Sequence, residues 1–126
     1  MAQPQSVTVC MHTGTGVAAD TTFGAVHGQS GEWELSAASF VPTEATADGS
    51  SNKYTITLKQ AGTAVSTALD SDAAGWAIGT AYAFTLSAAG ASLEFGASDV
   101  VQIVCDETGT ATMGGNLFLT FGQVRV

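Results

Sequence analysis

In the stretch KYTITLKQ, which starts at residue 53, Tyr54, Ile56 and Leu58 alternate with polar residues. A period of two is that of a β-strand with one buried and one solvent-facing side, and it does not fit a helix face. The next letters, QAGT, predict a hairpin in which Gly62 takes the left-handed position of a three-residue loop. The chain must therefore accommodate at least one antiparallel hairpin.

Further strand-like stretches follow one another along the chain, separated by turns rich in Gly, Ser, Asp and Asn. About half of all residues are Ala, Gly, Ser or Thr, a composition that favours strands and turns over helices. We predict an all-β protein: a single antiparallel β-sandwich over residues 1–126, of the jelly-roll type, with residues 1–6 as a flexible N-terminal arm. The expected strands cover residues 6–12, 21–27, 33–41, 53–60, 63–69, 81–87, 100–105 and 117–126.

The charge balance narrows the partners. Eleven acidic residues against three basic ones give a net charge of −8, so we expect neither nucleic acid nor an anionic membrane surface as a partner. No run approaches the roughly 20 apolar residues of a membrane span. The opening MAQPQSVTVC lacks the charged region and long apolar run of a signal peptide. We expect the protein to be made and used without export.

The two cysteines, Cys10 and Cys105, both lie in strand-like stretches. The favoured interpretation is a pair of small buried residues with free thiols, as in a reducing cytoplasm. A disulfide would require the first and seventh strands to pair, and the sequence leaves that geometry open.

Nothing in the sequence forms a catalytic or zinc-binding pattern. His12 and His27 end the first two strands outside any triad motif, and we interpret them as partly exposed strand-end residues. Together with the cysteines they lack the close ligand pairs of a zinc site. We therefore expect no enzyme activity, no metal and no cofactor.

Two acidic motifs are candidate sites. Glu32 and Glu34 flank Trp33, so alternation places both carboxylates opposite the indole. A glycosidase would use such a pair only if the two acids had separate roles in a cleft. A solvated strand face is the favoured interpretation.

Asp70 and Asp72 resemble the opening of an oxygen-rich calcium loop. Ala74 stands where the third ligand belongs, so the favoured interpretation is an acidic turn whose side chains bond their own backbone. A weak calcium site would need completion by Asp99 or Asp106.

Trp76 lies in the Gly- and Ala-rich stretch DSDAAGWAIG. A large ring in such a loop either folds back on the rim of the sandwich or meets a partner, and Trp76 is therefore a candidate contact residue.

The order of elements resembles one family. The run ELSAASFVPTEATADGSSNKYTITLKQAGTAVSTALD, then GTAYAFTLSAAGASLEFGASDVVQIVC and GTATMGGNLFLTF, is similar to head-decoration (cement) proteins of tailed bacteriophages. The resemblance implies a β-sandwich assembled in the host cytoplasm and bound to the outer surface of the virion. It also implies that the partners are the major capsid protein and neighbouring copies of the chain, in a trimer or another small cluster.

Two segments are candidates for that contact. Lys53 and Lys59 would form a basic spot on the solvent-facing side of their strand, and solvation of an edge strand is the alternative. The polar residues Gln3, Pro4 and Gln5 would form an arm that becomes ordered on a partner. The alternative function is a carbohydrate-binding or adhesion module of a phage fibre or bacterial surface protein, with a ring platform or calcium site near Trp76, Asp70 and Asp72.

Overall fold

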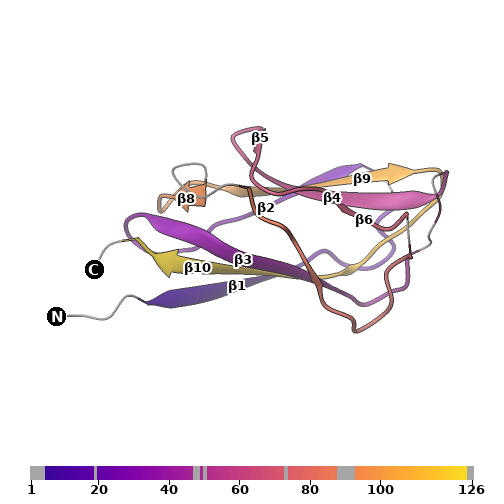
Figure 1. The fold of residues 1–126 in the computed structure, drawn as a ribbon, viewed down its shortest axis with the longest axis horizontal. Helices are drawn as coiled ribbons and strands as arrows, with labels where there is room; N and C mark the ends of the chain where they lie inside the picture. The colour runs from indigo at the N-terminus through magenta and orange to yellow at the C-terminus, as the bar shows by residue number, and fades with distance from the viewer. Residues whose placement is uncertain are drawn as a thin grey trace.

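Two antiparallel β-sheets lie face to face in this protein, as Figure 1 shows. The computed structural model describes residues 5–18, 20–46, 49, 51–72, 74–87 and 93–124. The prediction of an all-β antiparallel sandwich is confirmed. The strands are β1 (Ser6–His12), β2 (Thr21–Ala25), β3 (Trp33–Pro42), β4 (Lys53–Gln60), β5 (Thr63–Ala64), β6 (Leu69–Asp70), β7 (Tyr82–Ala83), β8 (Glu94–Phe95), β9 (Val101–Thr108) and β10 (Gly115–Gln123).

Successive strands mostly alternate between the sheets. The β10 sheet has the order β1-β10-β3-β7, with β8 also paired to β3, and the β9 sheet has the order β2-β9-β4-β5, with β6 also paired to β4. The strands β10 and β3 are central in the first sheet, and β9 and β4 are central in the second. Every long strand thus pairs with one that is distant in the sequence.

The predicted strand boundaries hold where alternation is strongest and fail near the edges. The strands expected at 6–12 and 53–60 match β1 and β4. The one expected at 63–69 is reduced to β5 and β6, and the one at 81–87 to β7. Between them the chain crosses from one sheet to the other: Thr67 N donates to Thr85 O and Ser87 N donates to Val65 O. These residues bond to each other instead of extending the sheets.

The β4–β5 hairpin closes more tightly than predicted. Gln60 pairs with Thr63, which leaves Ala61 and Gly62 as a two-residue loop with φ of 49° and 84°. Positive φ at both positions defines a type I′ turn, whose twist matches that of the flanking strands. The left-handed Gly62 is confirmed, and the three-residue loop is wrong.

The core fills the space between the sheets. On β4 the side chains of Tyr54, Ile56 and Leu58 are fully buried, and the intervening residues are half-buried. The same alternation continues along β10. A bulge interrupts the β10–β3 ladder between Thr120 and Phe121. The bulge adds one residue to β3, so that alternate side chains both before and after it face the core.

The two cysteines lie in opposite sheets and are both free. Cys105 on β9 is buried, and desolvation, with Asp106 nearby, raises the pKa of its thiol to about 12. Cys10 on β1 is exposed, so the expectation that both are buried is wrong for Cys10. In the part of the chain that the structure describes, no helix is long and apolar enough to cross a membrane.

Candidate interaction surface

On the outer side of the β9 sheet, the charge of Lys53 is already paired. Lys53 Nζ lies 3.1 Å from Asp70 Oδ2 and 3.8 Å from Asp72 Oδ2. The strand β4 is also not an edge strand, because β9 flanks it on one side and β5 and β6 on the other. Neither interpretation of Lys53, an exposed basic spot or a protective charge on an edge strand, fits this geometry. The ammonium group of Lys53 is paired with carboxylates of the same chain, and β4 is not an edge strand.

Asp70 belongs to a closed acidic turn. The Asp72 amide donates to Asp70 Oδ1 at 2.9 Å, and Thr55 Oγ1 donates to Asp70 Oδ2 at 3.3 Å. Partial burial acts to raise the pKa of Asp70, but the bonds from Asp72 and Lys53 outweigh it and hold the pKa below its ordinary value of 3.8. The favoured interpretation, a turn bonded to its own backbone, matches this geometry.

The residues weighed for a calcium site do not come together. Asp99 accepts the Gly96 amide at 2.8 Å in a different loop, and Asp106 lies across β4 from Asp70, with Thr55 between them in the ladder. Within the described ranges, no group of three or more His, Cys, Asp or Glu residues is arranged to hold a metal ion.

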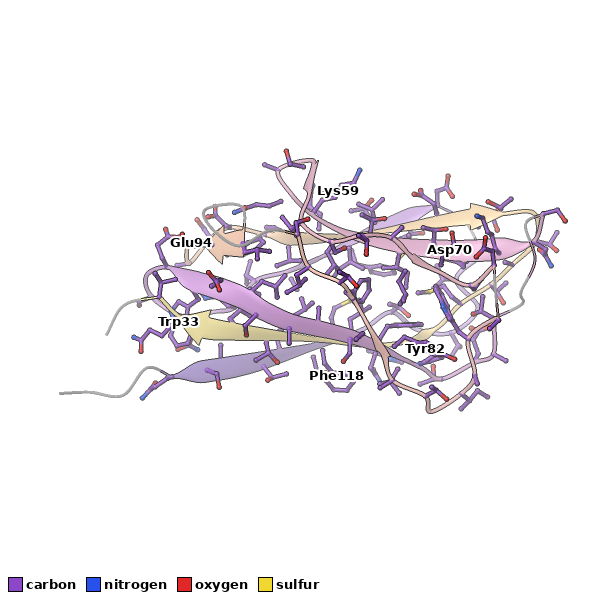
Figure 2. The ribbon with its side chains drawn as sticks, viewed as in Figure 1. Trp33, Lys59, Asp70, Tyr82, Glu94 and Phe118 are labelled. Carbon is purple, nitrogen blue, oxygen red and sulfur yellow. The ribbon has the colours of Figure 1, made fainter. Side chains whose placement is uncertain are left out.

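Lys59 occupies the other end of β4. Its backbone pairs with Ala64 on β5 and with Gln102 on β9, and its side chain points away from the core (Figure 2). Of the two lysines proposed as a basic spot, Lys59 alone lacks a carboxylate partner among the described residues. The spot is therefore a single charge.

Trp76 is a core residue. It is 2% exposed, and its ring contacts that of Phe40 edge-to-face, with 5.1 Å between centroids. Its backbone pairs with Thr46 in an isolated bridge. Of the two interpretations of Trp76, the structure shows the one in which the ring folds back on the sandwich. No face of the ring is left for a partner.

The proposed arm is described only at its end. Gln3 and Pro4 lie outside the described residues. Gln5 is exposed, but its carbonyl accepts the Gln123 amide at 2.8 Å. The β1–β10 ladder therefore extends to Gln5, and Ser6 is the first residue of β1 and not part of an arm.

The two histidines differ from each other. His12 is exposed and bonds Asn116 through its Nδ1 at 2.8 Å. His27 is 3% exposed, its Nε2 lies 2.8 Å from Phe95 O, and its Nδ1 accepts the Gln29 amide. The interpretation as a partly exposed strand end is wrong for His27, which closes one end of the core.

Glu34, next to Trp33 in the sequence, lines a hollow of about 290 Å³ together with Ser36, Gly122, Gln123 and Val124. Trp33 is 5% exposed and donates its indole N–H to Ser30 O. Glu34 lies on the opposite side of β3 and pairs across the ladder with Glu94. Alternation predicted this split between the two sides of the strand.

Sequence reasoning missed the outer side of the β10 sheet. Because Leu117, Leu119 and Phe121 point into the core, the residues between them point outward. The neighbouring strands add their own outward side chains in register with β10. We name this surface the uncharged face; it consists of Thr8, Cys10, Ala37, Ser39, Val41, Ala83, Asn116, Phe118 and Thr120.

The uncharged face is flat and built mainly from small side chains. One row across it runs Cys10, Phe118, Ser39 and Ala83, and Figure 2 shows Phe118 projecting away from the core. In the next row, Thr8 and Thr120 bond through their hydroxyls at 3.0 Å. None of these residues is Lys, Arg, Asp or Glu, although the chain has a net charge of −8.

A hollow of about 550 Å³ lies beside the β4–β5 turn. Three of its polar side chains already have partners: Gln102 accepts the Gly62 amide, Gln60 donates to Glu94 O, and Asp99 accepts the Gly96 amide. These three side chains therefore have little hydrogen-bonding capacity left for a ligand in the hollow.

Comparison of this chain with protein-family models, curated proteins and solved structures gave no match.

Proposed function

We propose that this chain is a structural virion protein that binds the outer surface of a phage capsid and decorates or stabilises it. The observation that carries the proposal is the uncharged face, a broad sheet surface without charge in a strongly acidic chain. Its support from the sequence is the resemblance to head-decoration proteins.

The physical basis is desolvation. Cores of protein interfaces are depleted of charged residues, because a buried charge loses its hydration and the new contacts do not fully compensate for that loss. A face of Ala, Ser, Thr, Val and Phe loses little on contact with the major capsid protein. The acidic remainder of the molecule would be repelled by packaged DNA and favours an external location. Repetition over a lattice adds avidity.

We also propose that the sandwich is a jelly roll. Counting β5 with β6 and β7 with β8 gives eight consecutive segments, ordered 1-8-3-6 in one sheet and 2-7-4-5 in the other. That order supports a jelly roll, an architecture also used for viral capsid domains.

A matched pair of threonines tests the proposal. Thr120 and Thr57 both point outward from central strands, but Thr120 lies on the uncharged face and Thr57 on the charged β9 sheet. We expect Thr120→Glu to reduce occupancy on purified capsids of the virus that encodes this sequence by on the order of tenfold or more. Thr57→Glu should bind as the unsubstituted chain does.

Circular dichroism would establish that both variants are folded, and gel quantification of sedimented capsids would measure occupancy. Equal occupancy of the two variants would place the contact elsewhere, with Lys59 as the next candidate. Absence of binding by the unsubstituted chain would contradict the function itself. The carbohydrate-binding alternative relied on Trp76 and the Asp70 turn, and neither presents a free binding group.

A further inference from the structure

The strand β1 leaves one edge of the β10 sheet open. Gln123 N donates to Gln5 O, and Thr13 N donates to Gly115 O. Antiparallel ladders alternate, so the odd-numbered residues of β1 bond β10. The N–H and C=O groups of the even-numbered residues, Ser6 to His12, point outward. Among the described strands, none pairs with that side.

This edge lacks the features that usually prevent strand pairing. Residues 6–12, SVTVCMH, contain no Pro, Lys, Arg, Asp or Glu, and the β1–β10 register runs without a bulge. Native proteins protect exposed edges with these devices. By contrast, β2 is shorter and follows Asp20, and the remaining edge strands β5 to β8 have two residues each.

The inward side chains of β1 are incompletely covered. Val7, Val9 and Met11 face the core but are only half-buried. A strand added beside β1 would cover these apolar side chains as well as satisfy the open backbone groups.

We infer that a second copy of this chain pairs with β1 in antiparallel fashion, about a two-fold axis at Val9. In this register Ser6 lies opposite His12 of the second copy and Thr8 lies opposite Cys10 of the second copy. In each of these pairs, the backbone N–H and C=O groups that point away from β10 then form two hydrogen bonds with those of the opposite residue. The inward side brings Val9 against Val9 and Val7 against Met11.

The β1 edge suits a second copy of this chain as the occupant. Two chains of net charge −8 repel each other, so they associate best where neither presents a carboxylate. The β1 edge is such a place, and its sequence is compatible with itself about a two-fold axis. The contact needs no capsid, so it holds or fails independently of the proposed function, and it links copies in pairs rather than threes.

The test compares two changes at Thr8. Its N–H points outward, so Thr8→Pro removes two symmetry-related bonds of the dimer, one from each copy, without removing one from the β1–β10 ladder. Thr8→Val keeps the N–H and, like Pro, removes the hydroxyl. Sedimentation equilibrium should show a dimer for the unsubstituted chain and for Thr8→Val. The dissociation constant of Thr8→Pro should rise by on the order of ten- to hundredfold.

A monomeric unsubstituted chain at every concentration overturns the inference, as does a Thr8→Pro dimer of unchanged strength. Crosslinking decides the matter if Thr8→Pro does not fold. In the inferred register, the two Cys10 residues are diagonal neighbours, about 7–8 Å apart, and Cys105 is buried. A short bis-maleimide should join two chains, and Cys10→Ser should prevent it. Failure of the native chain to crosslink would refute the contact.

Discussion

At the scale of single residues, two serines replace backbone acceptors along β4. Ser66 Oγ accepts the Leu58 amide at 3.0 Å, and Ser71 Oγ accepts the Tyr54 amide at 2.9 Å. Both serines are buried. Where the crossing chain leaves the ladder, their hydroxyls supply the oxygens that buried amides require.

Loss of one such hydroxyl should be costly. We expect Ser71→Ala to lower the free energy of unfolding by about 1–3 kcal/mol, because the buried Tyr54 amide loses an acceptor. Ser36→Ala is the matched control, since the Ser36 hydroxyl bonds Thr120 O at an exposed site and should change stability by less than about 0.5 kcal/mol. Urea unfolding would measure both, and equal effects would contradict the role given to Ser71.

The sequence could not reveal these residue roles. Trp76, His27 and Lys53 were interpreted from their immediate neighbours. Their surroundings come instead from distant segments: Phe40 against Trp76, Phe95 bonded to His27, and Asp70 beside Lys53. Asp70 was interpreted correctly as a turn residue because its partner, the Asp72 amide, is local in the sequence.

At the scale of elements, success depended on how strongly each strand is amphipathic. The bounds of β1 and β4 could be predicted because the side chains of each strand alternate between a more buried and a more exposed side. The short strands β5 to β8 could not, because side-chain and cross-sheet bonds replace ladder bonds there. The bulge on β3 left only a weak trace in the sequence, two outward residues in succession, Ser36 and Ala37.

The close approach of β10 to β3 gives an element-scale prediction. A methyl group at Gly115 would lie 2.5 Å from Val41 O and 2.7 Å from the Phe40 ring, whereas one at Gly122 would meet nothing within 4 Å. We expect Gly115→Ala to lower the free energy of unfolding by about 1–3 kcal/mol through overpacking. Gly122→Ala, on the same strand, should have little effect. Thermal unfolding of the pair would test this, and a stable Gly115→Ala variant would argue against the contact.

At the scale of the whole molecule, most outward charges lie on one sheet, and the β10 sheet carries Glu34 and Glu94 at one end. The β9 sheet carries Lys53, Lys59, Asp70 and Asp106, while the centre of the β10 sheet carries none. Sequence alone showed a net charge of −8 but not this separation, because strand order decides which outward positions become neighbours. The antiparallel sandwich could be predicted, and its most distinctive surface could not.

The charge distribution also sets the salt dependence of the inferred dimer. Because the contact has no ion pairs and joins two acidic molecules, screening by sodium chloride should strengthen it. We expect the dissociation constant to fall by roughly two- to tenfold between about 0.02 and 0.2 M salt. Sedimentation equilibrium across this range would measure the trend. A dimer that weakens with salt would indicate opposite charges at the contact.

The bond between Gln123 and Gln5 places the two ends of the described chain side by side, at one pole of the sandwich (Figure 1). A peptide or fluorescent label attached before Gln5 or after Val124 would therefore emerge from the same pole. The loops that follow β1 and precede β10 lie at the opposite pole and would remain unobstructed by such a fusion. Either attachment point would give a tagged protein whose cargo projects in one common direction.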